Sequence, residues 1–418
     1  MTDHPPASRS GKAALLLALY LAQGLPYGFF TLALPVLLRD AGLSLTAISA
    51  LGLLALPWAF KFLWAPLLDQ RGTRRGWLLA LQGSSILGAL SLTQLDLDSS
   101  YALLFAAAFA FNLVAASQDV VTDGLAVRLL DARERGLANG LQVGAYRLGM
   151  ILGGGLLLWI FARAGWQVMF LCMAALLALA LVPVLRMREP ARSVTAPRLR
   201  SPDLAVLWFR RALQPPMLAL AGLIFCYRFG DQMVTSLLGP FLTDAGLDLA
   251  TIALMKGAVG SATSLAGAAL GGAFVYAVGR RQALLVAGLA QAACFSLYIA
   301  AALGAGGVNL LWAATVLEGV IGTMATVALF TLMMDAADPE HAGTDYTLLA
   351  STVVLVGTLA GFIAAVIADA IGYAPTFILG TLLAAAGCLF LVWWLDHRSI
   401  PGRVADAWRA ASVPDYPR

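Results

Sequence analysis

Long apolar runs follow one another along almost the whole chain. Each run holds about twenty residues, the length that an α-helix needs to cross the hydrocarbon core of a bilayer. A soluble domain carries about 25% charged residues, whereas this sequence carries 12% and has a mean hydropathy of +0.83. We therefore predict an all-α polytopic membrane protein with twelve transmembrane helices: 13–38, 45–68, 77–95, 101–125, 135–161, 167–185, 217–243, 251–278, 283–303, 308–334, 344–368 and 374–395.

A nine-residue motif occurs twice, as DAGLSLTAI at Asp40–Ile48 and as DAGLDLATI at Asp244–Ile252. Each copy lies between two apolar runs, and each is followed by a short basic turn that begins at Arg74 or at Arg280. Two similar helical bundles around a central site are a common design of secondary transporters. The repeat predicts two six-helix halves, with the following parts: 1–12 N-terminus, 13–185 first bundle, 186–216 basic linker, 217–395 second bundle and 396–418 tail.

The distribution of basic residues predicts the orientation, because cytoplasmic loops hold the excess of Lys and Arg. Of the 27 basic residues, four lie inside the apolar runs, with Arg135 counted in the loop before its run, and two, Arg39 and Arg163, lie in loops that we place outside. The other 21 lie in the termini and in loops on the opposite side, so we predict that both termini, the linker and the tail are cytoplasmic. Basic loops of this kind bind anionic lipid, and they give no reason to expect nucleic acid as a partner.

The sequence offers no pattern of catalytic or cofactor chemistry. Its four cysteines lie in apolar runs without paired spacing, and its three histidines lie in loops or tails, so we expect no disulfide, metal, haem or other cofactor. No glycine-rich nucleotide loop and no soluble catalytic domain is recognisable, so we expect no enzyme. A transporter without a nucleotide site depends on an ion gradient, and buried carboxyl groups favour protons.

Ionisable groups inside the apolar runs are the candidates for function, because they are costly in hydrocarbon and usually face a cavity or a partner. Asp119 and Asp123 are four residues apart on one helix face, where their like charges favour keeping a proton. For Asp123 an ion pair with Arg74 or Arg75 is the structural alternative. We predict that proton coupling uses Asp119, Asp123, Asp231 and Glu318.

Arg228 and Asp231 are three residues apart and can neutralise each other on one helix. The pair is either a device for inserting the helix or a site that opens when an anionic substrate binds the planar guanidinium group. The Gln23–Gly28 segment contains Pro26, which predicts a break where backbone is free to contact a ligand, with a simple kink as the alternative. The candidate substrate-binding residues are Gln23, Tyr27, Lys61, Gln142, Tyr146, Arg147 and Arg228.

The turn APLLDQRGTRR at Ala65–Arg75 resembles the signature of the major facilitator superfamily between its second and third helices, with Ala65 where glycine is usual. This resemblance implies a cytoplasmic gate formed by Asp69, Arg74 and Arg75. Several further motifs resemble the muropeptide permease and acetyl-CoA transporter group of that superfamily: Gly24-Leu25-Pro26, Lys61–Asp69, Arg75–Leu79, Ser117–Asp123, Glu134-Arg135-Gly136, Tyr146–Met150 and Tyr227–Asp231.

Within that group, the expected twelve spans and the segments Gln23–Phe30 and Ala342–Leu348 look more like the siderophore permeases of the rhizobactin and pyochelin type. Muropeptide permeases are similar in the motifs but typically longer. The resemblance implies a proton-driven importer of a siderophore in the bacterial inner membrane, with an anionic small molecule as substrate. Uptake of a muropeptide or another peptide-like metabolite is the first alternative, and export of drugs or metabolites is the second. A monomer is compatible with this interpretation.

Overall fold

A computed structural model of the chain describes residues 9–40, 53–54, 56–95, 101–132, 134–187, 210–248, 251–252, 254–397 and 402–409. These residues form two compact units. Unit 1 comprises Met1–Leu129, Leu141–Trp208 and Asp338–Thr347, and unit 2 comprises Leu130–Gly140, Phe209–Ala337 and Leu348–Arg418. Helices α8 (Arg135–Ile151) and α15 (Ala342–Ile371) therefore contribute residues to both units.

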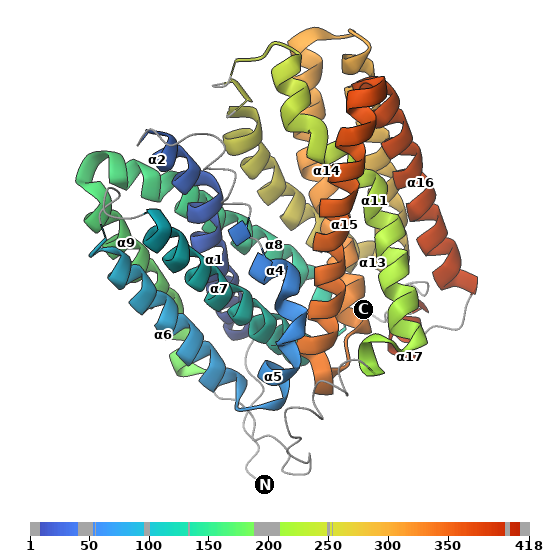
Figure 1. Ribbon diagram of the computed structural model, residues 1–418. Coiled ribbons are helices and arrows are strands. Elements are labelled where there is room, and N and C mark those ends of the chain that lie inside the picture. Colours follow the sequence, from blue (N-terminus) through green and yellow to red (C-terminus); the bar gives the residue numbers. More distant parts are fainter. Residues whose placement is uncertain are drawn as a thin grey trace. The chain divides into compact units, whose positions relative to one another are not determined.

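Unit 1 is helical throughout its described residues (Figure 1). The helix α6 lies alongside α7 and α9, and α1 packs against α7 and α9. Besides most of α8, the elements of unit 1 are α1 (Arg9–Gly28), the π-helix η1 (Phe29–Ala33), α2 (Leu34–Asp40), α4 (Leu56–Phe60), the 3₁₀-helix η3 (Lys61–Leu63), α5 (Ala65–Gln70), α6 (Arg74–Leu92), α7 (Tyr101–Leu129), the π-helix η4 (Leu152–Leu156), α9 (Leu157–Arg186) and the 3₁₀-helix η6 (Pro339–His341).

Unit 2 is likewise helical in its described residues. The helix α11 packs along α16, and the long helix α13 packs along α14 and α16 (Figure 1). Besides most of α15, its elements are α11 (Pro215–Asp244), the π-helix η5 (Leu254–Val259), α13 (Gly260–Ala302), α14 (Gly307–Ala336), α16 (Tyr373–His397) and α17 (Gly402–Arg409).

Eight helical stretches of the described residues are long and apolar enough to cross a membrane. Two of them, Arg135–Arg186 and Leu254–Ala302, contain a sharp turn at a glycine with positive φ, at Gly165 (φ 80°) and at Gly279 (φ 82°). A left-handed backbone at these positions suits glycine, which has no Cβ to clash. The turns fall between spans that the sequence predicts as separate, 135–161 and 167–185 in one case and 251–278 and 283–303 in the other. The total of twelve spans stays a prediction.

The structure corrects two local predictions in unit 1. The described part of the predicted span 45–68 is not one helix but α4, η3 and α5, and the 3₁₀ turn lies between Pro57 and Pro66, each of which lacks an N–H donor. The predicted break at Gln23–Gly28 was wrong, because this segment is helical through Pro26. The irregular backbone is the π turn η1, which begins directly after Gly28.

Glycines bring the first helix of unit 1 against α8 and η4. A Cβ atom on Gly149 would overlap the backbone of Leu21 and Gly24, and one on Gly153 would overlap the carbonyl of Leu25. In unit 2, Gly267 has the same relation to the backbone of Val320. Such close approach is how helices associate in a bilayer, where the hydrophobic effect gives no net attraction.

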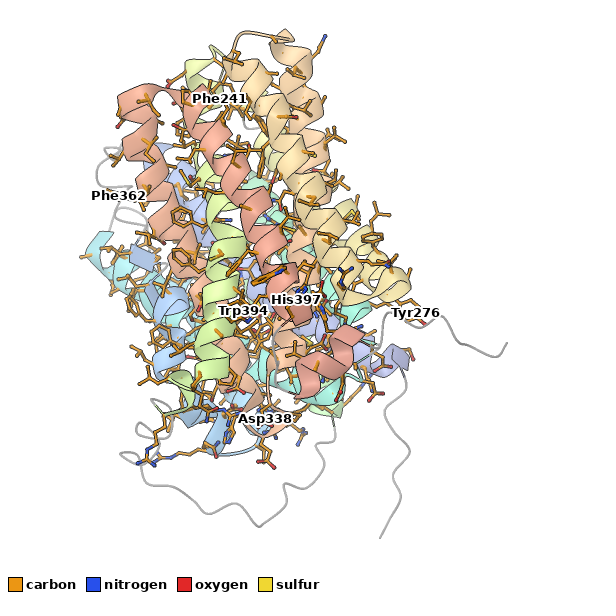
Figure 2. All side chains as sticks on the ribbon, turned by 90° about the vertical axis from the view of Figure 1, so that its right-hand side faces the viewer. Phe241, Tyr276, Asp338, Phe362, Trp394 and His397 are labelled. Carbon is orange, nitrogen blue, oxygen red and sulfur yellow. The ribbon has the colours of Figure 1, made fainter. Side chains whose placement is uncertain are left out.

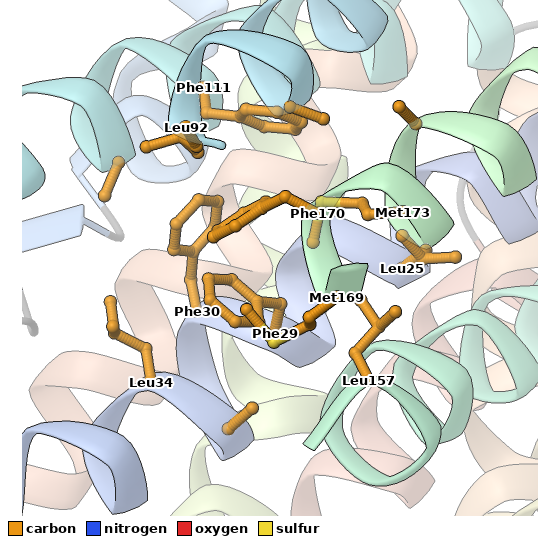
Figure 3. Close-up of a cluster of buried hydrophobic side chains, with 14 of the residues drawn as sticks. Leu25, Phe29, Phe30, Leu34, Leu92, Phe111, Leu157, Met169, Phe170 and Met173 are labelled. Atoms are coloured by element: carbon orange, nitrogen blue, oxygen red, sulfur yellow. The ribbon is translucent and has the colours of Figure 1, made fainter. Parts of the chain in front are cut away.

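The core of unit 1 contains a large aromatic cluster, here called the Phe29 cluster (Figure 3). The ring centroids of Phe29 and Phe170 lie 5.1 Å apart, and those of Trp166 and Phe170 lie 4.8 Å apart, in edge-on geometry that aromatic rings favour. Its members come from α1, η1, α2, α6, α7 and α9, and they include Leu25, Phe29, Phe30, Leu34, Leu92, Phe111, Leu157, Met169, Phe170 and Met173.

Large apolar side chains also cover the outside of the helices. Phe362 on α15, labelled in Figure 2, is 69% exposed, and Trp159 on α9 is 53% exposed. Many Leu and Val side chains on other helices are exposed as well. Soluble proteins rarely expose so much apolar surface, whereas a surface that faces lipid must.

Candidate functional site

Lys61 and Asp119 form a buried ion pair between η3 and α7. The side chain of Lys61 enters the unit from the 3₁₀ turn, and its Nζ lies 5.6 Å from the centroid of the Trp58 ring. Trp64, at the other end of the turn, donates from Nε1 to Oγ of Ser117 over 3.0 Å. The turn is thus attached to α7 at two points. The buried positive charge of Lys61 is tolerated because the negatively charged carboxylate of Asp119 is in contact with it.

Asp123 is bonded to neutral donors from two other helices. The Tyr20 hydroxyl on α1 donates to Oδ1 of Asp123 over 2.9 Å, and Nε2 of Gln142 on α8 lies 3.3 Å from the same oxygen. Gln142 also lies 3.5 Å from the hydroxyl of Tyr346 on α15. The alternative partner Arg74 is bonded to Asp69. One lysine therefore faces two carboxyl groups within one helical turn, so this group is electrically neutral only when it also holds one proton.

Three aromatic rings meet beside this charged group, one each from α1, α4 and α8. The centroid of Tyr27 lies 5.5 Å from that of Trp58 and 5.6 Å from that of Tyr146, and Trp58 lies 6.4 Å from Tyr146. All three side chains are partly exposed, as is Arg147 next to Tyr146. We call Tyr27, Trp58 and Tyr146 the aromatic corner. It places two predicted substrate residues, Tyr27 and Tyr146, beside a third, Lys61.

Arg228 and Asp231 form the predicted pair within α11, with Nη1 2.6 Å from Oδ2. Asp231 also accepts from Nε2 of Gln291 on α13 over 2.6 Å and from Nε2 of its neighbour Gln232 over 3.1 Å. Nε of Arg228 is buried and has no hydrogen-bond partner among the described residues. Oε1 of Glu318 on α14 and Nε2 of Gln291 both lie against Gly322, so Glu318 belongs to the same neighbourhood.

The residues of the predicted gate are bonded within unit 1, at the start of α6 and the start of α15. Arg74 pairs with Asp69, and the other carboxylate oxygen of Asp69 accepts from the backbone N–H of Thr344 over 2.8 Å and from its hydroxyl over 2.9 Å. Asp69 is on α5, and its carboxylate thus lies at the N-terminus of α15, where a negative charge is favoured. Arg75 instead donates to the carbonyl oxygens of Val184 and Leu185 at the end of α9.

A second buried charge cluster in unit 2 was missed in the sequence. Asp335, at the end of α14, pairs with Arg135 over 2.8 Å and with Arg280 over 2.9 Å, and Arg280 also donates to the carbonyl oxygen of Ala132. The basic turn of the second repeat therefore binds a carboxylate 55 residues away, whereas Arg74 binds one only five residues away. The repeat in the sequence located the arginines, but it gave no sign of the different carboxylate.

Two other polar partners were also overlooked, Tyr20 and Gln291. Both are polar groups inside predicted apolar runs, which is the signal that selected Asp119, and that criterion applied to neutral residues would have found them. The structure brings together Lys61, Asp119 and the aromatic corner in unit 1, and Arg228 and Asp231 with Gln291 in unit 2. The predicted meeting of Arg228 with the residues of unit 1 stays a prediction.

The family model described as "Major Facilitator Superfamily" matches residues 16–351, most of the chain. The chain belongs to the Major Facilitator Superfamily. It is accordingly a multi-pass membrane transporter and not an enzyme. Solved structures show the same fold: the Escherichia coli fucose:proton symporter (TM-score 0.72, 14% identity, 92% of this chain and 98% of that one) and the human organic anion transporter MFSD10 (TM-score 0.71, 17% identity, 93% and 100%).

The relatives of this transporter include an anhydromuropeptide permease. This chain is 29% identical over 397 residues to the anhydromuropeptide permease of Escherichia coli K12. The alignment covers 91% of this chain and 79% of the relative. The chain is 30% identical over 395 residues to an uncharacterized protein of Haemophilus influenzae, covering 88% and 91%. A putative AmpG transporter of Rickettsia felis is 22% identical over 397 residues, covering 90% and 95%. The expected closeness to siderophore permeases finds no support in these relatives, which favour the muropeptide alternative.

Proposed function

We propose that this transporter imports a muropeptide, a compound of amino sugar and short peptide, across the bacterial inner membrane in symport with protons. The similarity to the anhydromuropeptide permease over 91% of the chain is the observation that carries the proposal. The proposal replaces siderophore import as the leading interpretation, and import of a siderophore becomes a competing outcome of the experiment below.

The groups in unit 1 suit the chemistry of such a substrate. The aromatic corner offers ring faces on which the apolar face of a sugar can stack. Lys61 is the cation that can hold a substrate carboxylate, and Gln142 carries an Oε1 atom that is buried without a partner among the described residues. A muropeptide presents all three kinds of group: a sugar ring, carboxylates and amides.

The Lys61–Asp119 pair supplies a mechanism of coupling. While Asp119 is ionised and Asp123 holds a proton, Asp119 neutralises Lys61. A proton on Asp119 ends the attraction and leaves the ammonium group to bind an anionic substrate, so that proton and substrate enter together. Release of the proton on the other side restores the ion pair and expels the carboxylate. Each step keeps the buried charge near zero, as a low-dielectric site requires.

The experiment is uptake into proteoliposomes that contain the purified transporter and carry an inwardly directed proton gradient. We expect accumulation of a radiolabelled anhydromuropeptide, and loss of accumulation when the gradient is collapsed by a protonophore. Trp58→Ala should reduce uptake at least tenfold, whereas Trp159→Ala, a tryptophan on the lipid-facing surface, should leave it unchanged. Accumulation of a ferric siderophore in place of the muropeptide would refute the proposal.

A further inference from the structure

The core of unit 1 consists of two apolar clusters rather than one. The Phe29 cluster is described above, and a second cluster, here called the Leu19 cluster, contains Leu15, Leu19, Leu68, Leu78, Val121 and Val184. The helices α1, α6, α7 and α9 each contribute to both clusters. On each of these helices the chain must therefore cross a level that separates the two.

On three of these helices, α1, α6 and α7, a glutamine lies near that crossing. On α1, Gln23 follows Leu19 of the Leu19 cluster by one helical turn and directly follows Ala22 of the Phe29 cluster. Gln82 follows Leu78 by one turn on α6, before the Phe29 cluster resumes at Ala89. Gln118 lies on α7, between Phe111 of the Phe29 cluster and Val121 of the Leu19 cluster. We call Gln23, Gln82 and Gln118 the glutamine layer.

The amides of the glutamine layer are buried and largely unpaired. The residues are 1%, 0% and 2% exposed for Gln23, Gln82 and Gln118. Both amide atoms of Gln23, both of Gln82 and Nε2 of Gln118 lack a hydrogen-bond partner among the described residues. Buried polar atoms are almost always hydrogen-bonded, to protein or to ordered water, because leaving them unpaired costs most of their desolvation energy.

We propose that the glutamine layer binds a small cluster of ordered water molecules inside unit 1. The ligand must be small, because these side chains are almost inaccessible from the surface. It must both donate and accept, because the five atoms include three amide nitrogens and two carbonyl oxygens. The layer holds no charged side chain that would balance an ion, so an uncharged ligand suits it. Water meets all three conditions, and internal water typically makes about three hydrogen bonds to such groups.

The cluster adjoins the carboxyl groups of the candidate site. Tyr20, which donates to Asp123, lies three residues before Gln23 on α1, and Gln118 directly precedes Asp119 on α7. The titratable groups around Asp123 are Asp119 on α7, Lys61 on η3, Tyr20 on α1 and Tyr346 on α15. The water cluster is thus in a position to carry protons to the Asp119 and Asp123 carboxyl groups, a role that rests on the proposed proton coupling.

A high-resolution map of the full-length transporter tests the water cluster directly. We expect density for water about 2.7–3.2 Å from Gln82 Nε2 or Oε1, and at least one such water shared with Gln23 or Gln118. Absence of density at these amides would overturn the proposal, and so would direct amide–amide bonds that leave no space for water.

Thermal unfolding of Gln82→Met gives a second test. The sign of the change in Tm separates an amide that binds water from an amide that is dry and unpaired. Met has nearly the shape of Gln, so the substitution removes the polar atoms with little change in packing. If the amide binds water, its loss leaves that water short of a partner, and the Tm falls by about 2–4 °C. If the amide is dry and unpaired, its removal raises the Tm. Leu78→Met, one turn away in the Leu19 cluster, is the control for placing Met in this core.

The role in proton supply has a readout of its own. In proteoliposomes we expect Gln82→Met to slow the proton uptake that accompanies substrate entry at least threefold, while binding of the unlabelled muropeptide stays within twofold of wild type. Unchanged proton uptake by a variant whose Tm has fallen would remove the route while leaving the water cluster in place. Failure of the wild type to transport muropeptide would instead concern the proposed function alone.

Discussion

Two buried ion pairs in this transporter neutralise a buried charge in different ways. Arg228 and Asp231 are three residues apart on α11, so one helix supplies both charges. Lys61 and Asp119 are 58 residues apart, and the pair exists only when η3 and α7 are packed together. The first pair is a property of a helix, whereas the second is a property of an assembled bundle.

This difference determines what protonation can do. Neutralising Asp231 changes the charge on one helix but breaks no contact between helices through that pair. Neutralising Asp119 releases Lys61 and at the same time loosens the attachment of η3 to α7. A charge change that alters helix packing is the kind of local event that can shift a conformational equilibrium. We therefore expect Lys61–Asp119 to carry the coupling, and Arg228–Asp231 to serve substrate binding.

The largest effect is expected for Asp119→Asn. The change removes the negative partner and leaves the Lys61 ammonium buried and unpaired, which typically costs about 3–5 kcal/mol of stability. It also removes the proton carrier, so accumulation against a gradient should fall at least 100-fold. Uptake by proteoliposomes and thermal unfolding of the purified protein measure the two consequences separately.

The double variant Lys61→Met with Asp119→Asn separates coupling from stability. It removes both charges, so most of the stability lost in the single variant should return, as is common when a buried pair is replaced as a whole. Uptake should remain absent, because neither the proton carrier nor the cation is present. Normal pH-dependent accumulation by either well-folded variant would exclude Asp119 from the coupling mechanism.

The contrast between the pairs also explains what could be predicted from the sequence. Helices, membrane location and the Arg228–Asp231 pair follow from local rules: apolar length, and a spacing of three residues on one helix. Gly149 and Gly153, four residues apart in sequence, are likewise a local signal for close helix contact. Family membership was recognisable from the motif at Ala65–Arg75, which lies within one short stretch of chain.

The contacts that could not be predicted are those that depend on how the helices pack against one another. Whether Lys61 meets Asp119 depends on the 3₁₀ turn that replaces a continuous helix between Pro57 and Pro66. Likewise, Asp335 binds Arg280 and Arg135 only after α14, α13 and the start of α8 come together. No short-range pattern encodes these meetings. Polar residues in apolar runs indicate that a partner exists, but not which partner it is.

An intermediate effect is expected for the double variant Arg228→Gln with Asp231→Asn. If the pair only helps to insert α11, the neutral double variant should transport normally, because it needs no insertion device. We expect instead a loss of uptake of about tenfold, since the guanidinium fork that holds a carboxylate is gone. Uptake kinetics over a range of substrate concentrations distinguish a change in KM from a change in rate.

Arg228→Lys is the companion of that variant. It keeps the charge and the pairing with Asp231 but loses the planar pair of donors, so it should raise KM while leaving the amount of folded protein in the membrane unchanged. A double neutral variant with normal uptake would assign Arg228 to insertion and remove it from the substrate site.

The smallest effect is expected for Gln291→Met, which removes the 2.6 Å hydrogen bond from α13 to Asp231 but leaves both charges of the pair. A hydrogen bond to a charged group contributes about 1.5–3 kcal/mol, and this one joins two helices. We expect a loss of stability at the lower end of that range, because Arg228 and Gln232 still bond the carboxylate. Uptake should fall only a few-fold.

The matched control is Gln232→Met, which removes the longer bond from a partly exposed neighbour and should change stability by less than about 0.5 kcal/mol. If Gln291→Met abolished coupling as completely as Asp119→Asn, the pair on α11 would depend on helix packing too, and the distinction between the two pairs would fail.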